Sequence, residues 1–243
     1  MLNTYNMYLE ARSIVAMSDM FYSKMISLIS LVRPMQSKYM VNAETELVIE
    51  GFPRSANTYM ASWFELAQRR PTAISSHLHE SFQVRFAERE NIPCIVLVRR
   101  PLDAVASAIL RDNRMQPRSL LRNYKRFYRE VVRVHKNSVV VRFEDVVMDA
   151  NKAIDELNIR YGTCFSKLPD EDHHKVAREV KNKHLKMFNI QDVDPLKIAA
   201  PTAEKETAKA RIAESIKTNT ELLRLCEEVY EEVLGLARRS ASA

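Results

Sequence analysis

The chain has 243 residues, a hydrophobic content of 46 % and a formal net charge of +6, which fit one ordinary domain with an apolar core of its own. It contains only three glycines, which excludes collagen-like and glycine-rich repeats as well as the G-x-G-x-x-G dinucleotide-binding motif. Any loop that binds a phosphate must therefore use one glycine or other small residues.

Apolar periodicity predicts strands that alternate with helices along the chain. In order, we expect a helix over 5–32, a strand over 47–51, a helix over 58–68, an extended segment over 72–79, a strand over 94–98, a helix over 102–111, a helix over 118–136, a strand over 139–141, and helices over 170–186 and 202–237. Such alternation is typical of βαβ units, which predicts an α/β fold with a parallel sheet and right-handed crossovers.

A single domain is expected because no internal repeat and no Gly/Ser linker divides the sequence. We expect an N-terminal helical segment over 1–43, an α/β core over 44–165 and a helical C-terminal part over 166–243. These C-terminal residues are polar and charged in their first part, so the core is expected to end before them.

The last predicted helix contains a candidate break near Thr218, where Thr218-x-x-Glu221 has the spacing of a capping box. Apolar residues from Ile212 to Val233 also follow a heptad-like spacing, which would suit a coiled coil. At this length we favour a helix packed on its own domain.

Positive charge is concentrated in the middle of the chain. Between Arg99 and Arg142 there are twelve Lys or Arg residues and three acids, a net of +9, so the rest of the chain is net negative. A bound nucleotide or polyanion would need such a local field. The simpler interpretation is a solvated basic face on the predicted helix, where arginines 118, 122, 126, 129 and 133 lie on one side.

The three cysteines, Cys94, Cys164 and Cys226, are an odd number in apolar surroundings, which is typical of a reduced intracellular protein and predicts a cytoplasmic location. No Cys/His spacing suggests a zinc site, so no metal is expected. The N-terminus lacks the pattern of a signal peptide. Residues 13–33 are apolar but are interrupted by charges, so no membrane-spanning helix is predicted.

The most informative stretch follows the first predicted strand and reads Gly51-Phe52-Pro53-Arg54-Ser55-Ala56-Asn57-Thr58. A strand that leads through a short loop into a helix can direct backbone N–H groups and the helix N-terminus at an anion. Arg54 adds a guanidinium suited to phosphate or sulfate oxygens. The nucleotide-binding P-loop would need Gly and Lys where Ala56 and Asn57 stand, which argues against an ordinary NTPase. Alternatively, Ser55, Asn57 and Thr58 serve only as helix caps.

A second motif follows the strand over 94–98 and reads Arg99-Arg100-Pro101-Leu102-Asp103, with Ser107 further along. Arg99 leaves the end of the strand, and Ser107 lies about two turns into the next helix. Both side chains could therefore hold one phosphate near the carboxyl edge of the sheet. Asp103 falls in the first helical turn, where the helix dipole favours an acid.

Together these two motifs resemble the cofactor-binding motifs of the sulfotransferase family, which transfers a sulfuryl group from 3′-phosphoadenosine 5′-phosphosulfate (PAPS). The first is similar to P-[KR]-S-G-[TS]-[TS] and the second to R-[ND]-P-x-D-x-x-x-S, while Arg142-Phe143-Glu144-Asp145 resembles the family segment R-[YF]-E-D. The resemblance covers residues 48–145 in the family's order. It implies a three-layer α/β fold with a central parallel sheet and a P-loop-like phosphosulfate-binding loop.

The resemblance also implies roles for individual residues. Arg54 would contact the transferring sulfuryl group, and Arg99 and Ser107 would hold the 3′-phosphate. The full set of cofactor-binding residues that it implies is Arg54, Ser55, Ala56, Asn57, Thr58, Tyr59, Arg99, Ser107 and Lys205. Tyr59 stands where several family members place a tryptophan that stacks on adenine. Ala56 departs from the usual glycine and Asn57 from the usual hydroxyl residue.

Lys205 belongs to a segment that resembles the basic lid of the family. Residues 200–205, followed by Lys209 and Arg211, precede a predicted helix, and such a segment would close over the nucleotide. The alternative is an ordinary helix start with Thr202 as N-cap. Both interpretations stay open.

Attack on sulfur by an acceptor hydroxyl requires a base, for which an imidazole is efficient near neutral pH. His77 and His79 lie between the two motifs, and the resemblance implies a catalytic histidine in this part of the chain. In an extended segment both would point to the same side. We rank His77 first, His79 second and Glu80 third. Charge stabilisation by Arg54 would complete an in-line transfer that needs no metal.

The sequence therefore predicts a PAPS-dependent sulfotransferase acting on a hydroxyl or amine acceptor. The alternatives are a P-loop-type nucleotide kinase or phosphotransferase, and a non-enzymatic module that binds polyanions through the basic helix over 118–133. The acceptor could be a small molecule, a glycan or a lipid. No nucleic-acid partner is expected, because no nucleic-acid-binding motif accompanies the charge, and contact with a membrane surface stays open.

Overall fold

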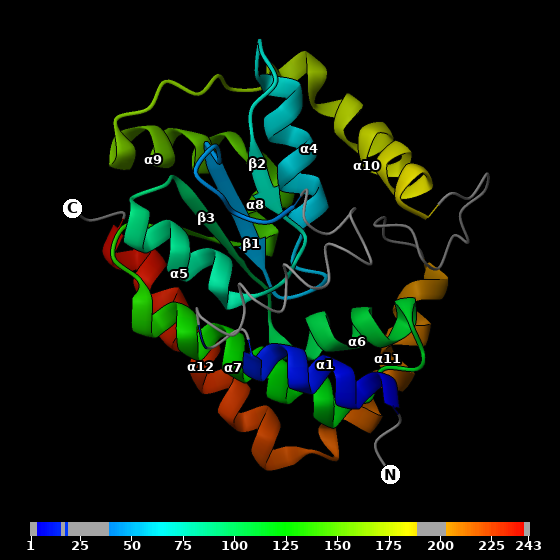
Figure 1. Cartoon of the computed structure of the whole chain (residues 1–243). Coiled ribbons are helices and arrows are strands. Elements are labelled where there is room, and N and C mark those ends of the chain that lie inside the picture. Colours follow the sequence, from blue (N-terminus) through cyan, green and yellow to red (C-terminus); the bar gives the residue numbers. More distant parts are fainter. Residues whose placement is uncertain (1–3, 16–17, 19–38, 189–202, 241–243) are drawn as a thin grey trace.

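The computed structural model describes residues 4–15, 18, 39–188 and 203–240 (Figure 1). Within them, four strands form one sheet: β1 (Leu47–Gly51), β2 (Ile74–Ser76), β3 (Cys94–Val98) and β4 (Val139–Arg142). The helices are α1 (Thr4–Val15), α4 (Asn57–Ala67), α5 (Ser81–Glu90), α6 (Pro101–Arg111), α7 (Pro117–Val134), α8 (Phe143–Asp149), α9 (Asn151–Tyr161), the 3₁₀ helix η1 (Asp170–Asp172), α10 (His173–Phe188), α11 (Ala203–Lys217) and α12 (Thr220–Ser240). The predicted α/β class is confirmed.

All strand pairs are parallel, and the order across the sheet is β2-β1-β3-β4. The two central strands, β1 and β3, are buried along their whole length. Their near-continuous apolar sequences are typical of strands covered on both faces. The predicted central parallel sheet is therefore present.

Helices cover both faces of the sheet (Figure 1). One apolar core joins the sheet to α5, α6, α7 and α12, and its largest side chains include Tyr124 and Tyr128. The other joins the opposite face to α4, α8, α9 and α10 around Trp63, Phe64 and Ile154. Such an arrangement is compatible with the expected three layers.

Three helices were not predicted: α5, α8 and α9. The first supplies the crossover that carries the chain from β2 to β3, as parallel neighbours require. The expected extended segment over 72–79 is wrong beyond Ser76, where β2 ends. The N-terminal helix is present as far as Val15, while the rest of its predicted range, up to residue 32, lies outside the described residues apart from Ser18.

The predicted break in the C-terminal helix is confirmed between α11 and α12, but the capping box is not. The Thr218 hydroxyl donates back to the Ser215 carbonyl. The residue before α12 is Asn219, and its carbonyl accepts the Leu223 N–H. Helix α12 packs on α7 and contributes Cys226 to the first core. The packed-helix interpretation thus holds for the described residues, in place of a coiled coil.

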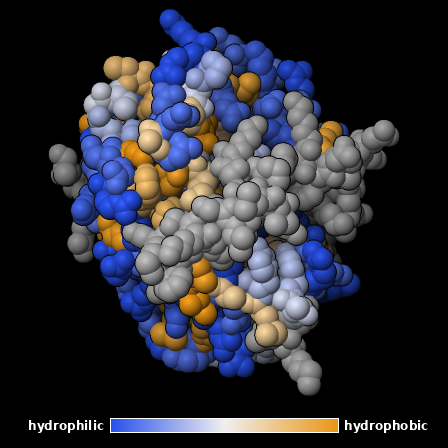
Figure 2. Space-filling view, in the orientation of Figure 1, coloured by the Kyte–Doolittle hydropathy of each residue, from blue (hydrophilic) through white to orange (hydrophobic). Residues whose placement is uncertain are grey.

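The surface in the view of Figure 2 is largely hydrophilic at its periphery, with hydrophobic residues in smaller patches. The most exposed large apolar side chains in the described part of the chain are Ile159 and Met148, at 82 % and 75 % exposure. None of the helices that the structure describes combines the length and the apolar character needed to cross a membrane.

Candidate functional site

The candidate site lies at the carboxyl edge of the sheet, between β1 and β3. Residues 52–56 lead from β1 to α4 on one face, whereas β3 leads directly to α6 on the other face. The two connections therefore diverge from neighbouring strands, and open parallel sheets bind ligands at such a point. Because β2 is the other neighbour of β1, the segment after β2 reaches the same edge.

Direct contacts join the two sequence motifs. The Arg54 Nε donates a hydrogen bond to the Ser107 Oγ at 3.0 Å, across 53 residues of sequence. The Arg99 Nη1 donates to the Arg54 carbonyl oxygen, also at 3.0 Å. The structure thus brings together the three residues that the sequence predicts for a phosphorylated ligand.

Arg99 is held from several sides. Its guanidinium lies over the Phe143 ring, 3.9 Å from the ring centroid, a cation–π contact. Tyr124 on α7 donates its hydroxyl to the Arg99 carbonyl at 2.7 Å. Phe143 belongs to the third predicted motif, so the geometry gives that motif a positioning role: it orients the arginine of the second.

The backbone of the loop is unusual at two places. Arg54 and Ala56 have φ angles of 72° and 75°, in the left-handed region that favours glycine. Ala56 therefore adopts the conformation expected of the glycine it replaces. Gly51 is needed for another reason: a Cβ there would lie 2.4 Å from the Leu97 carbonyl oxygen of β3.

We expect Ala56→Gly to raise the free energy of unfolding by up to about 1 kcal/mol, because it removes the strain of an alanine at positive φ. The matched control is Ala61→Gly, inside α4 and buried, which should lower it by about 1 kcal/mol or more. Urea unfolding followed by circular dichroism measures both. Equal destabilisation by the two changes would contradict the left-handed conformation of Ala56.

The N-terminus of α4 has no side-chain cap. Ala56 occupies the N-cap position, and the first intrahelical bond runs from Met60 N–H to the Ala56 carbonyl at 2.9 Å. The capping alternative for the loop residues is therefore wrong. The backbone N–H groups over 57–59 precede that first bond and can donate to an anion.

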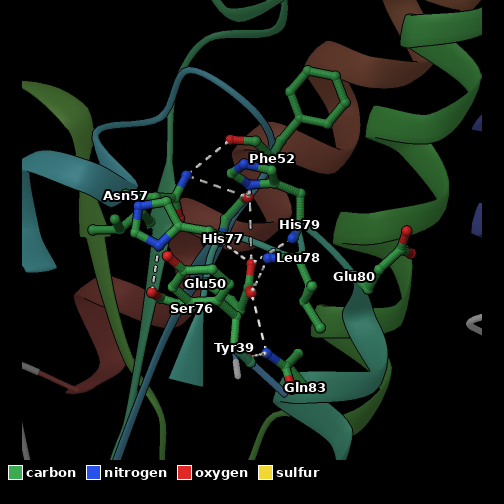
Figure 3. A network of polar contacts seen from close by, with 12 residues as sticks. Tyr39, Glu50, Phe52, Asn57, Ser76, His77, Leu78, His79, Glu80 and Gln83 are labelled. Carbon is green, nitrogen blue, oxygen red and sulfur yellow. Dashed lines mark hydrogen bonds and ion pairs between the residues drawn. The ribbon is translucent and has the colours of Figure 1, made fainter. Parts of the chain in front are cut away.

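The loop side chains serve different purposes. The Asn57 amide nitrogen donates weakly to the carbonyls of Gly51 and Phe52, at 3.4 and 3.3 Å (Figure 3). Ser55 is fully buried. The Ser55 N–H already donates to the Phe52 carbonyl at 3.2 Å. Of these two residues, Asn57 is therefore the better suited to the predicted role as a donor to a phosphate, through its backbone N–H at the start of α4.

A third arginine, Arg111 of α6, joins the site, and the sequence motifs did not predict it. Burial, together with the charges of Arg111 and Arg99, lowers the pKa of Arg54 to about 10. Among the described residues no carboxylate forms an ion pair with Arg54. Arg111 lies one helical turn after Ser107 on the same face of α6, a spacing that could have revealed it. Because burial and neighbouring cations act on Arg54 in the same direction, an anionic ligand beside it would be favoured.

Helix α10 borders the same cluster, although no motif marks it in the sequence. Burial and the charges of Arg111 and Arg54 lower the pKa of His184. Lys183, whose Nζ pairs with Glu65 of α4 at 2.7 Å, is close enough to affect His77. The cluster is thus assembled from three elements, α4, α6 and α10, with the loops after β1 and β2.

The two histidines of the segment after β2 point in different directions (Figure 3). His77 and His79 have φ angles of 68° and 57°, so the backbone is not extended and their rings do not share a side. The His77 Nε2 lies 3.2 Å from the Thr58 Oγ1 of α4, and its Nδ1 contacts the Ser76 hydroxyl. The His79 Nδ1 donates to the Gly51 carbonyl at 2.9 Å. Only His77 is therefore directed at the first turn of α4.

Both rings are neutral at pH 7. Burial and the charges of Lys183 and Arg111 lower the pKa of His77 to about 4, and burial lowers the pKa of His79 to about 3. Neutral imidazoles can accept a proton. Glu80, the third candidate base, instead pairs with Arg12 of α1 at 2.6 Å, and burial raises its pKa to about 7.

The last two predicted cofactor-binding residues are Tyr59, which the structure describes, and Lys205, whose side chain it does not. Tyr59 is half-buried, with its ring 6.0 Å from that of Trp63. The Lys205 side chain and residues 200–202 lie outside the described residues, so the predicted lid stays a prediction. Its first described helix, α11, packs on α6, which carries Ser107.

The basic face of α7 is covered in part by other helices. Arg122 pairs with Glu10 of α1 and Arg129 with Glu232 of α12, at 3.3 and 3.5 Å. Arg126 donates to Ser13 of α1. These contacts give the arginines partners within the chain, so no observation favours the polyanion-binding alternative.

Comparison with known proteins gives no relative from which a role could be transferred. The sequence matches no protein-family model, and no curated protein is similar to it. The chemistry of the site is therefore derived from its own groups: three guanidinium groups, a hydroxyl, an uncapped helix N-terminus and a neutral imidazole.

Proposed function

We propose that the chain is a sulfotransferase that moves a sulfuryl group from PAPS to an acceptor hydroxyl or amine. The observation that carries the proposal is the contact of Arg54 with Ser107 and of Arg99 with the Arg54 carbonyl, each at 3.0 Å. The two motifs meet at one edge of the sheet. PAPS carries two separate anionic groups, a phosphosulfate and a 3′-phosphate, so each motif would bind one of them.

The donor set fits this ligand. Guanidinium groups and backbone N–H groups are the donors that phosphate and sulfate oxygens prefer. Burial and, to a lesser extent, the neighbouring cations Arg111 and Arg99 lower the pKa of Arg54, so an anion there would stabilise its charge. Arg54 and the N–H groups over 57–59 would hold the phosphosulfate, and Arg99 with Ser107 would hold the 3′-phosphate.

When bound, PAPS supplies an activated sulfuryl group together with its leaving phosphate. The chain's own residues would then orient the reactants and balance charge. Arg54 would stabilise negative charge that develops between sulfur and the bridging oxygen. The neutral His77 ring contacts the Ser76 hydroxyl through Nδ1 and the Thr58 hydroxyl through Nε2. It would accept the proton of the acceptor at Nε2, where the acceptor hydroxyl would take the place of the Thr58 hydroxyl. Without the acceptor, the Thr58 hydroxyl keeps that ring beside the start of α4.

The kinase alternative has no observation in its favour. The loop holds Asn57 where a nucleotide kinase needs its lysine. The cation of the same loop, Arg54, reaches towards Ser107 of the second motif. A ligand phosphorylated at the 3′ position would use both arginines, whereas ATP has no group for Arg99.

Calorimetric titration with 3′-phosphoadenosine 5′-phosphate (PAP) tests the donor site. We expect micromolar binding of PAP at moderate salt and much weaker binding of ATP. Arg99→Ala should weaken PAP binding by about 10- to 100-fold, because charge-assisted hydrogen bonds to the 3′-phosphate are lost. Arg224→Ala, on exposed ion pairs of α12, is the control and should bind normally. Equal affinity for PAP and ATP, or none for either, would contradict the proposal.

A further inference from the structure

The buried side chain of Glu50 contacts the segment after β2, which carries both histidines. Glu50, in β1, has 0 % exposure. Its Oε1 accepts the Leu78 N–H at 3.1 Å, and its Oε2 accepts the His79 N–H at 3.0 Å (Figure 3). The two oxygens of one side chain thus hold two consecutive backbone groups of the segment after β2.

These two hydrogen bonds hold a segment whose backbone is strained. His77 and His79, which flank Leu78, both have positive φ, and a residue with a Cβ in that conformation costs about 1 kcal/mol or more. Buried N–H groups without an acceptor would cost more still. The Glu50 carboxylate satisfies two such groups at the place where the chain turns, so it stabilises the conformation that separates the two rings.

The neighbours of Glu50 reinforce the same conformation. The Gln83 amide nitrogen lies 3.4 Å from the Glu50 Oε1 and donates to Ser75 at 2.8 Å. The His79 ring donates to the Gly51 carbonyl, next to Glu50 in β1. His79 is therefore bound to the end of β1 through both its backbone and its ring, which leaves His77 as the ring that faces α4.

We propose that Glu50 is a positioning residue, which holds the turn over 77–79 so that the His77 ring stays beside Thr58. The proposal rests on the proposed function only in taking His77 as the base. The side chain of Glu50 accepts hydrogen bonds from the backbone of Leu78 and His79 and from Gln83, so it is expected to affect proton transfer without affecting the donor site.

The chain offers a matched control. Glu88 is also buried, at 8 % exposure, and its two carboxylate oxygens accept the N–H groups of Asn137 and Ser138 at 3.0 and 2.9 Å. It therefore performs the same task on the loop before β4, away from the histidines. Glu50→Gln and Glu88→Gln each replace one acceptor oxygen with an amide that cannot accept the second N–H.

The first experiment is a pH titration of the histidine ring resonances by NMR in the protein without substrate. In the natural protein His77 should titrate near its lowered pKa of about 4. In Glu50→Gln the released turn exposes the ring, so its midpoint should move towards the ordinary value of about 6.5, while Glu88→Gln leaves it unchanged. If Glu50→Gln does not fold, Glu50→Asp is used, which keeps the carboxyl group but is one methylene too short to reach both N–H groups.

The second experiment compares catalysis with binding in the same variants. We expect kcat to fall about 10- to 100-fold in Glu50→Gln, since small misplacements of a catalytic group have effects of that size, with PAP affinity unchanged. An unchanged His77 titration, or a parallel loss of PAP affinity, would overturn the proposal, as would an equal loss in Glu88→Gln. A shifted His77 titration in a protein that does not bind PAP would instead refute the proposed function alone.

Discussion

His77→Ala is expected to lower kcat by about 10²- to 10⁴-fold, the usual contribution of a general base. PAP affinity should change little, because His77 contacts the hydroxyls of Thr58 and Ser76, whereas the proposed donor site uses the Thr58 backbone N–H and not its hydroxyl. Initial rates with labelled PAPS at saturating acceptor, together with calorimetry, measure the two quantities separately. His79→Ala is the matched comparison, because the His79 ring donates to the Gly51 carbonyl and does not face α4.

The pH dependence of kcat gives an independent check on His77. Its pKa is lowered to about 4, so the ring stays neutral and active as the pH falls from 7 to 5, and it is protonated only below that range. A histidine with the ordinary pKa of about 6.5 would lose about 25-fold between pH 7 and pH 5. A flat profile over this interval supports the buried base. Full activity in His77→Ala with a large loss in His79→Ala would transfer the role to His79.

Arg54→Ala is expected to lower kcat/KM by about 10²- to 10³-fold, as removal of one donor to a developing negative charge does in other group-transfer sites. Arg54→Lys should recover part of this loss, because it restores a charge without the planar guanidinium that reaches Ser107. The same kinetic assay with labelled PAPS measures both variants.

Although Arg54→Ala is expected to lower kcat/KM, it should not lower the stability of the protein. Burial and the neighbouring charges of Arg111 and Arg99 lower the pKa of Arg54, which means that the folded state holds this cation at a cost. Arg54→Ala should therefore melt at the same or a higher temperature, whereas Arg224→Ala, which removes exposed ion pairs, should melt slightly lower. A clearly lower melting temperature for Arg54→Ala would indicate that the residue has a structural role.

Local sequence patterns were enough to predict the sheet and the edge at which the two motifs meet. The apolar runs over 47–51 and 94–98 became the two central strands with the expected bounds. Parallel strands have their carboxyl ends at one edge, so the motifs that follow them had to meet. The contact between Arg54 and Ser107 is a consequence of that topology.

The helices missed by the sequence analysis show where local patterns fail. Helix α5 carries buried Gln83 and Glu88 among its apolar residues, so its pattern lacks a clean apolar stripe. Helix α8 has only seven residues, too short for a period to be recognised. Both are fixed by packing on the sheet rather than by propensity.

The sequence by itself determined the α/β class, the order of the strands along the chain and the loops that carry Arg54 and Arg99. Only the tertiary structure decided that Arg111 and α10 complete the cationic cluster, that α1 and α12 cover the arginines of α7, and that the turn over 77–79 separates the two histidines. The reason is physical: a strand or a helix repeats over a few residues and can be recognised locally. Burial, positive φ and the pairing of charges depend on contacts between segments that are far apart in the sequence.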